Sequence, residues 1–283
     1  MKRILITGVG SYVGMRVKRW LENYPDKYRV ETISLRDPSW KDKKFTSYDV
    51  IFHVAGIAHV STDPSMEDLY YAVNRDLTYE IALKAKAEGV RHFIFMSSII
   101  VYGDGNGKTI NHLTLPTPSN FYGKSKLQAE EAIRSIEDDK FRVAIIRAPM
   151  IYGKGNKGNY QKLSRIAQKT IVFPDFENER SMLHIDNLCE FVRHLVDFED
   201  AGIYYPQNRD YVKTTTMCRL IAEMHGKKIR FTRVFNPLIS LGISRLAIVN
   251  KVFGNLAYEK EMSNYKAEYC IRDFEESIKL TEL

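Results

Sequence analysis

The 283-residue chain has only three cysteines, and its sequence predicts no membrane span, secretion signal or internal repeat. Cys189, Cys218 and Cys270 show neither paired nor metal-ligand spacing, so we expect a reducing, cytoplasmic compartment and no metal site. The sequence predicts no membrane span, and the apolar run from Ile4 to Ile6 is too short for a secretion signal. Internal repeats and low-complexity tracts are also lacking, which excludes repeat architectures.

The chain has no long run of basic residues, although its net charge is +7. We therefore expect no nucleic-acid partner. The positive charge serves solubility, or it attracts anionic substrates or membrane surfaces. With 44% hydrophobic and 27% charged residues, the chain can form one large domain or two closely joined ones with an ample core.

A helix is predicted from Asn120 to Ile136, because its apolar residues recur at helical spacing. Tyr122 and Lys126 lie four residues apart, which places the phenol and the ammonium on one helix face. A nearby cation favours phenolate, so we expect the pKa of Tyr122 to fall below its usual ~10 and suit acid–base chemistry. Glu130 and Glu131 are expected to face water.

The start of the chain has the pattern of a dinucleotide-binding fold. An apolar strand from Lys2 to Thr7 leads through a Gly-rich turn, which ends at Gly14, into a helical pattern. Glycines let the backbone approach a pyrophosphate, and the helix N-terminus offers free N–H groups. The cofactor contacts predicted for this turn are Gly8, Gly10, Ser11, Tyr12 and Val13.

The second strand, from Val30 to Leu35, ends where an acidic residue often holds the ribose of NAD. Ser34 takes that position and Arg36 follows, and an Arg there suits the 2′-phosphate of NADP. NAD and NADP both stay open as the cofactor. About a dozen residues remain before the next strand, so one crossover unit of the fold is expected to be abbreviated.

Two more apolar strands end in residues suited to a ligand crevice. The first, Val50 to Gly56, ends in Val54, Ala55 and Gly56, whose small side chains leave room for a nucleotide. The second runs from Phe93 to Ser98, and the hydroxyls of Ser97 and Ser98 are expected to point into the crevice. A helix from Met66 to Gly89, which carries Asn74, is predicted between them.

Four motifs in this order resemble the extended short-chain dehydrogenase/reductase family, in its branch of NAD-dependent sugar epimerases and dehydratases. They are Thr7-Gly8…Gly14, His53-Val-Ala-Gly56, Ser97-Ser98-Ile-Ile-Val-Tyr-Gly103 and Tyr122…Lys126. The resemblance covers nearly the whole chain. It implies an α/β fold of the Rossmann type, with a doubly wound parallel sheet and a smaller C-terminal substrate-binding domain. It also implies a nicotinamide cofactor, NAD or NADP, and a nucleotide-sugar substrate.

The resemblance also assigns roles to single residues. Tyr122 matches the general acid/base of the family, and Lys126 matches the lysine that binds the nicotinamide ribose and lowers the tyrosine pKa. Ser98 matches the residue that bonds the reacting sugar oxygen, and Asn74 matches an asparagine near the cofactor. The turn departs from the family pattern at Ser11, where a glycine is usual.

Later parts of the chain fit the same family. The segment Arg147 to Gly153, with Pro149 and Ile151, resembles the strand that ends beside the nicotinamide, although Met150 replaces a frequent asparagine. Asn159 opens a predicted helix whose N–H groups suit a diphosphate. Arg180 matches an arginine that binds the sugar-nucleotide phosphate.

The expected division is a cofactor domain at 1–153 and a substrate domain at 154–283, with the strands of 171–212 possible additions to the first. The last part of the chain is less familiar. Residues Asn236 to Ala257 are too charged for a membrane span. They suit an amphipathic helix that closes the substrate pocket, or a surface for peripheral membrane contact. Asp273 to Leu283 matches the final helix of the family.

These features favour a UDP-hexose 4-epimerase that passes through a transient 4-keto sugar, with Tyr122 as acid/base and Ser98 on the C4 oxygen. The alternative is an NADPH-dependent reductase of 4-keto-6-deoxy sugar nucleotides that uses the same residues. A dehydratase is disfavoured, because Ile99-Ile100 replace its Asp-Glu pair, and the intact catalytic set disfavours a purely binding protein. The resemblance also implies a homodimer formed through the helices at 66–89 and 120–136.

Overall fold

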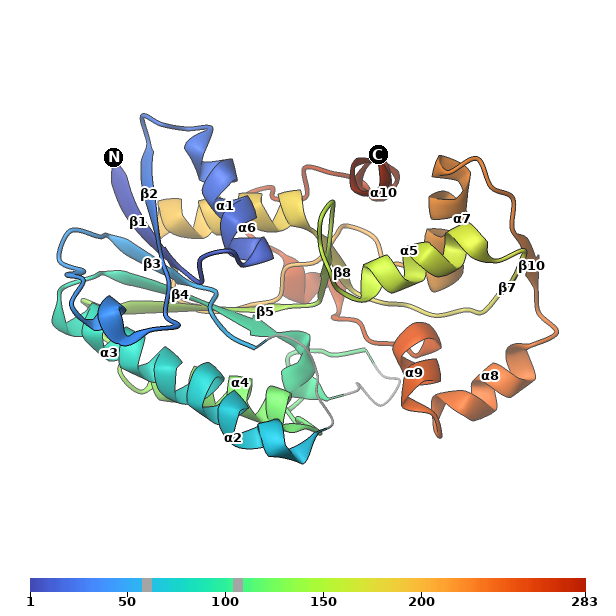
Figure 1. Cartoon of the computed structure of the whole chain (residues 1–283), viewed down its shortest axis with the longest axis horizontal. Coiled ribbons are helices and arrows are strands. Elements are labelled where there is room, and N and C mark those ends of the chain that lie inside the picture. The colour runs from blue at the N-terminus through green and yellow to red at the C-terminus, as the bar shows by residue number, and fades with distance from the viewer. Residues whose placement is uncertain (58–62, 104–108) are drawn as a thin grey trace. The chain divides into compact units, whose positions relative to one another are not determined.

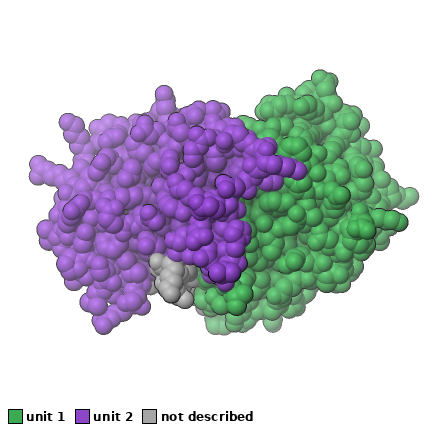
Figure 2. Space-filling view, turned by 180° about the vertical axis from the view of Figure 1, so that it is seen from behind, with its two compact units in different colours: residues 1–103, 115–148, 188–206 green, residues 104–114, 149–187, 207–283 purple. Residues whose placement is uncertain are grey.

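A computed structural model describes residues 1–57, 63–103 and 109–283. The chain divides into two compact units, which are coloured separately in Figure 2. Unit 1 consists of residues 1–103, 115–148 and 188–206, and unit 2 of residues 104–114, 149–187 and 207–283. The chain thus passes between the units several times. The division at residue 153 into a cofactor domain and a substrate domain stays a prediction about roles.

Unit 1 is built on a six-stranded parallel sheet with the strand order β2-β1-β3-β4-β5-β9. The strands are β1 (Lys2–Thr7), β2 (Tyr28–Ile33), β3 (Val50–His53), β4 (His92–Ser98), β5 (Arg142–Ala148) and β9 (Gly202–Tyr204). The chain places β2 on one side of β1 and β3 on the other, which opens a crevice at the carboxyl ends of β1 and β3. The predicted Rossmann-type fold is confirmed.

Helices cover both faces of this sheet (Figure 1). The helices α1 (Tyr12–Glu22) and α6 (Ile185–Phe198) lie on one face, and α3 (Leu77–Ala87) and α4 (Phe121–Arg134) on the other. Between β2 and β3 there is only the short 3₁₀ helix η1 (Pro38–Lys41), so this crossover is abbreviated as predicted. The main core joins apolar strand residues such as Ile51 and Phe93 to Ile81 of α3 and Ile133 of α4.

The predicted helix from Met66 to Gly89 is present but is not one regular α-helix. A 3₁₀ turn, η2 (Pro64–Met66), leads into α2 (Glu67–Tyr70), then into a π-helical segment, η3 (Tyr71–Asp76), and finally into α3. A π-helix within an α-helix occurs most often at functional sites. Here it carries Asn74, whose side chain is buried.

Unit 2 contains two small parallel sheets of two strands each, β6 (Met150–Tyr152) with β8 (Met182–His184) and β7 (Val172–Pro174) with β10 (Arg230–Thr232). Its helices are α5 (Asn159–Lys169), α7 (Thr214–Met224), α8 (Asn236–Ile243), α9 (Ala247–Phe253) and α10 (Phe274–Glu282), and it also has the 3₁₀ turn η6 (Lys260–Ser263). A further 3₁₀ turn, η4 (Ile99–Tyr102), belongs to unit 1. A second core includes Tyr152, Met217 and Ile278.

The expected amphipathic helix at 236–257 is replaced by two short helices, α8 and α9, with a turn between them. The final helix is confirmed as α10, and the Asp273 carboxylate caps its first turn. Among the residues that the structure describes, no helix has both the length and the apolar content needed to cross a bilayer.

Candidate functional site

The Gly-rich turn and the end of β3 are held together by the side chain of Thr7. Its hydroxyl oxygen accepts hydrogen bonds from the backbone N–H groups of Val54, at 3.2 Å, and Ala55, at 3.3 Å. It also bonds Nδ1 of the buried His53 at 2.9 Å. A Cβ atom on Gly8 would come within 3.2 Å of the Ala55 backbone, and Gly8 has φ +90°. The two loops therefore approach so closely that only glycine fits at position 8.

Ser11, which departs from the family pattern, caps α1. Its φ of −68° is ordinary for a side-chain-bearing residue, and its Oγ accepts a hydrogen bond from the Gly14 N–H at 3.2 Å. Gly10, with φ +78°, provides the left-handed conformation in this turn. A Cβ on Gly14 would lie 2.6 Å from Ser11 Oγ and 3.0 Å from Val54, so this glycine lets α1 pack closely on the sheet. Tyr12, in the first turn of α1 with Val13, completes the predicted set.

The end of β2 presents a cation and no acidic side chain at the predicted position. Ser34 accepts a hydrogen bond from the Arg36 N–H at 3.3 Å, and the Arg36 side chain is exposed. The neighbouring carboxylate of Asp37 is engaged by Ser39 at the start of η1. The Asp37 carboxylate therefore serves as a helix cap, and the exposed guanidinium of Arg36 is available to an anionic group.

Asn74 links the loop after β3 to α4. Its Oδ1 accepts a hydrogen bond from the Ile57 N–H at 2.8 Å, and its Nδ2 donates to the Ile57 carbonyl and to Ser125 Oγ, each at 3.2 Å. A Cβ on Gly56 would lie 2.9 Å from Asn74 Oδ1 and 3.2 Å from Lys126 Nζ. The structure thus brings together Gly56, Asn74 and Lys126, which belong to separate segments of the sequence. Their binding to a cofactor stays a prediction.

Lys126 is buried, and its ammonium is anchored on the sheet. Nζ donates to the Met96 carbonyl of β4 at 2.9 Å and lies 4.6 Å from the centre of the Phe95 ring. Burial lowers the pKa of Lys126 to about 8, while the Glu130 carboxylate acts in the opposite direction. Because an ammonium has three N–H donors, Lys126 can bind Met96 and still hold a hydroxyl group of a ligand.

Tyr122 is only 8% exposed, and its ring packs edge-on against Tyr70. The expected lowering of its pKa is not found. Burial raises the pKa of Tyr122 to about 12, although a hydrogen bond with Ser98 acts in the opposite direction. The Lys126 ammonium engages the Met96 carbonyl, and in the chain alone desolvation of the phenolate outweighs the hydrogen bond with Ser98. Ser98 also accepts from the Ile100 N–H at 3.3 Å.

The prediction that Glu130 faces water is wrong. Glu130 is buried and accepts hydrogen bonds from Arg147 of β5, at 2.6 Å from Nη2 and at 3.0 and 3.2 Å from Nε. Ser97 donates to the same carboxylate, and Arg147 Nη1 donates to the Tyr102 hydroxyl at 2.6 Å. Burial alone would lower the pKa of Arg147, but the hydrogen bonds to Glu130 and the negative charge of Glu130 raise the pKa of Arg147 above its usual value. The sequence analysis missed this pair. The one available signal was an arginine that directly follows the apolar run from Val143 to Ile146.

The remaining predicted residues belong to unit 2. Pro149 is buried just before β6, and Ile151 lies within that strand. Asn159 is exposed at the first position of α5, where no side chain caps the helix, so its first N–H groups suit an anion. Arg180 is half-buried, and its Nη1 donates to the Gly254 carbonyl at 2.6 Å.

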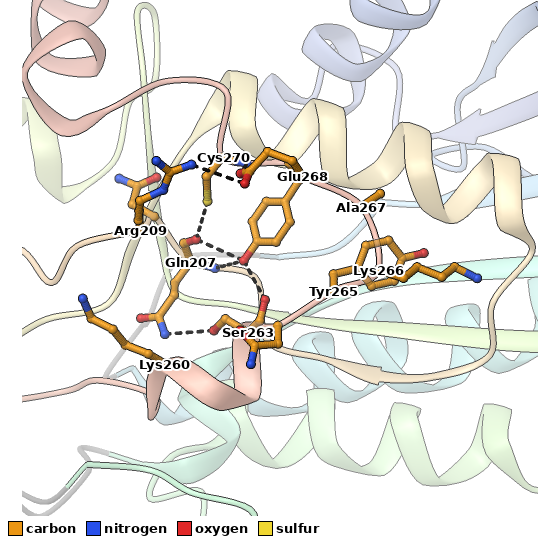
Figure 3. A pocket seen from close by; sticks show the side chains of 12 residues that line it. Gln207, Arg209, Lys260, Ser263, Tyr265, Lys266, Ala267, Glu268 and Cys270 are labelled. Carbon is orange, nitrogen blue, oxygen red and sulfur yellow. Dashed lines mark hydrogen bonds and ion pairs between the residues drawn. The ribbon is translucent and has the colours of Figure 1, made fainter.

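Unit 2 also contains a polar hollow of about 330 Å³ that the sequence analysis did not find (Figure 3). Its wall is organised by Gln207, which donates to Ser263 Oγ at 2.8 Å and whose carbonyl accepts from the Tyr269 hydroxyl and the Cys270 thiol. Figure 3 shows Arg209 and Lys260 along this wall, with Arg209 paired to Glu268 at 3.3 Å. These contacts join distant stretches of sequence, so no local motif announces them.

The residues of unit 1 fit a nicotinamide dinucleotide. At Gly8, Gly14 and Gly56 a Cβ would meet atoms of the protein itself, so these glycines let the ends of β1 and β3 and the start of α1 pack closely. This tight strand–turn–helix arrangement is the form that brings backbone N–H groups against a diphosphate. The N-terminus of α1 supplies N–H groups and a positive dipole end. Lys126 can hold a ribose hydroxyl, and Tyr122 with Ser98 can bond one oxygen of a second substrate.

Comparison with known proteins also indicates a protein that uses a nicotinamide dinucleotide. Residues 4–205 match the model of the NAD dependent epimerase/dehydratase family. The chain is 30% identical over 274 residues to the N-acetyl-alpha-D-glucosaminyl-diphospho-ditrans,octacis-undecaprenol 4-epimerase of Escherichia coli O157:H7, covering 89% of this chain and 81% of that protein. It is 30% identical over 246 residues to the UDP-glucose 4-epimerase of Vibrio cholerae, covering 78% and 75%.

Solved structures show the same fold. A dTDP-4-dehydrorhamnose reductase from Clostridium acetobutylicum superposes with a TM-score of 0.77 at 18% identity, over 98% of this chain and 97% of that one. Other structures of this fold contain NAD or NADP.

The chain therefore belongs to the NAD dependent epimerase/dehydratase family, and the resemblance drawn from its motifs is confirmed. Within that family it is an NAD(P)-dependent sugar-nucleotide enzyme of the extended short-chain dehydrogenase/reductase type.

Proposed function

We propose that this protein is a 4-epimerase of UDP-hexoses. The observation that carries the proposal is the arrangement of Tyr122, Ser98 and Lys126 at the carboxyl end of β4, beside a tight strand–turn–helix segment that fits a dinucleotide. A nicotinamide cofactor held by the Gly-rich turn and Lys126 would supply reversible hydride transfer at the sugar carbon, and in its oxidised form would add positive charge to the site. Tyr122 takes the proton of the C4 hydroxyl and gives it back, while Ser98 holds the C4 oxygen.

The pKa of Tyr122 decides when this step can occur. At about 12 in the chain alone, Tyr122 is a neutral phenol near pH 7, so proton removal needs a positive charge beside the ring. Lys126 lies one helical turn away and is held in place by the Met96 carbonyl. We therefore expect Tyr122 to become a base only in the complex with the oxidised cofactor.

Taken by itself, unit 2 contains groups suited to bind a diphosphate. Arg180 offers guanidinium donors, and the uncapped start of α5 at Asn159 offers backbone N–H groups. The two epimerases compared above act, by their names, on a UDP-sugar and on an undecaprenyl-diphosphate sugar. Both carriers attach the sugar through a diphosphate, so both belong in the assay.

The experiment that tests the proposal compares Tyr122→Phe with Tyr79→Phe, a half-buried tyrosine of α3 outside the proposed set. Epimerisation of UDP-glucose and UDP-galactose, and of an undecaprenyl-diphosphate-linked sugar, is followed by separating the sugars after incubation with NAD⁺. We expect Tyr122→Phe to lose activity at least 10³-fold while binding NAD⁺ within about threefold of wild type, and Tyr79→Phe to keep activity. Unchanged turnover in Tyr122→Phe would refute the assigned role.

A reductase of 4-keto-6-deoxy sugar nucleotides is the second candidate. Two observations favour it: Tyr122 is already protonated, as a proton donor to a carbonyl must be, and Arg36 stands exposed where a 2′-phosphate would lie. A reductase consumes one NADPH per product, whereas an epimerase leaves the cofactor unchanged, so absorbance at 340 nm separates them. Arg36→Ala should weaken the binding of NADPH at least tenfold. The control is Arg29→Ala, which alters an exposed arginine of β2 and should leave NADPH binding unchanged.

We further propose a homodimer formed through α3 and α4. Leu83 of α3 is exposed, while Leu77 is only partly covered by the core. Ile81 of α3 is fully buried in the core and is not available to a partner. Gel filtration at micromolar concentration should give a dimer, and Leu83→Asp should shift it to a monomer.

The cysteines are thiols, which supports the expected reducing, cytoplasmic compartment.

A further inference from the structure

An apolar surface of unit 2 stands exposed on α8 and the turn before it. Leu238 and Leu241 are 70% and 51% exposed, and their spacing of three residues places them on one face of the helix. Val234, in the turn before the helix, is 78% exposed. Phe235 and Leu246 extend the surface at either end. We call these five residues the α8 face. Exposed apolar clusters of this kind mark interaction sites.

The α8 face is held outward by contacts on the opposite side of the helix. Ile239 and Gly242 are buried, and Gly242 lies so close to Val249 of α9 that a Cβ would come within 3.2 Å of that side chain. Asn236 donates to the Asp175 carbonyl at 2.9 Å, and Arg233 pairs with the Asp175 carboxylate at 3.2 Å. These contacts fix the orientation of α8, so Leu238 and Leu241 stay exposed to solvent. In Figure 1, α8 lies at the edge of the part of the chain that forms unit 2.

The segment that carries this face has charge of one sign. Residues 224–258 contain no Asp or Glu but six basic residues, Lys227, Lys228, Arg230, Arg233, Arg245 and Lys251. The whole chain has 42 Lys and Arg against 35 Asp and Glu, so the remainder is nearly balanced. Arg245 follows Leu241 by four residues, and within the described part of the chain its guanidinium has no ion-pair partner.

We propose that the α8 face docks on the surface of a bilayer that contains anionic lipid. An apolar helix face flanked by Lys and Arg matches the interface between acyl chains and anionic headgroups. A second copy of the chain fits less well, because the two positive segments would then oppose each other. Docking itself is independent of the reaction proposed above. That it would bring the protein to lipid-linked sugar diphosphates rests on the proposed function.

The test is flotation of the full chain with vesicles, without substrate, so its result does not depend on catalysis. We expect binding to vesicles of phosphatidylcholine with about 30% phosphatidylglycerol at low salt, and at least tenfold weaker binding to pure phosphatidylcholine or at about 0.5 M salt. Failure of the wild type to bind the anionic vesicles would overturn the proposal, whatever the epimerase assay shows.

Two pairs of variants locate the binding surface. Leu238→Asp should weaken vesicle binding at least tenfold, whereas Leu113→Asp, which alters an 88% exposed leucine elsewhere in unit 2, should not. Arg245→Glu should weaken it several-fold, and Arg134→Glu, on α4, should leave it unchanged. Equal binding by Leu238→Asp and Leu113→Asp would refute the α8 face. So would a change of oligomeric state in Leu238→Asp with unaltered vesicle binding, which would assign the face to a second copy.

Discussion

Replacing Glu130 by Gln tests whether its ion pair with Arg147 stabilises unit 1. The substitution keeps the shape of the side chain but removes the charge that receives three contacts of 2.6 to 3.2 Å from the Arg147 guanidinium. Arg147 is only 5% exposed, so its charge would remain buried without a counter-charge. Loss of one partner of a buried ion pair costs about 3–5 kcal/mol in free energy of unfolding. In a chain of this size that lowers Tm by roughly 5–15 °C.

Thermal unfolding followed by circular dichroism measures this effect. The matched control is Glu131→Gln, because the adjacent glutamate is exposed and its loss should change Tm by no more than about 2 °C. The double variant Glu130→Leu with Arg147→Met should recover much of the loss, since both charges disappear together. Equal melting of Glu130→Gln and Glu131→Gln would refute the reasoning.

Three further predictions concern unit 1. Burial lowers the pKa of His53 to about 3, so as the pH falls the unfolded chain binds a proton before the folded chain does. The contribution of His53 to the free energy of unfolding is therefore complete above pH 6.5 and is lost between pH 6.5 and 3. In urea unfolding between pH 7 and 5, the free energy of unfolding of His53→Gln should fall by about 2 kcal/mol less than that of the wild type. Gly14→Ala, whose Cβ would lie 2.6 Å from the Ser11 cap, should weaken dinucleotide binding at least tenfold by calorimetry, whereas Gly89→Ala should leave binding unchanged. Asn74→Ala removes three hydrogen bonds made by a buried side chain and should lower the free energy of unfolding by about 1–3 kcal/mol in urea. A loss below about 0.5 kcal/mol would contradict the linking role.

The strands of unit 1 and the Gly-rich turn were predictable because their signals are local. Short apolar runs such as Ile4 to Ile6 identify buried parallel strands, and a strand followed by glycines and a helical pattern identifies a dinucleotide-binding turn. The spacing of Tyr122 and Lys126 placed them on one helix face because helical geometry alone fixes that relation.

Other features depend on partners far along the chain. Glu130 looked exposed beside Glu131, and only the fold brings Arg147, seventeen residues away, against it. The pKa of Tyr122 was predicted in the wrong direction because the amount of burial and the alternative acceptor for Lys126, the Met96 carbonyl, cannot be read from spacing. The π-helical turn at Asn74 was likewise hidden, since its pattern resembles that of an ordinary helix.

The repeated passage of the chain between the two units has a consequence for its synthesis. Unit 1 receives β9 and most of α6 from residues 188–206, after the chain has already supplied 149–187 to unit 2. The core of unit 2 includes Ile278 of α10, close to the C-terminus. Unit 1 is therefore not complete until part of unit 2 has been synthesised, although domains of many proteins fold in order as they emerge from the ribosome. A single cut cannot separate the units into two self-contained fragments, so exchange of unit 2 with a relative would require several junctions in the gene.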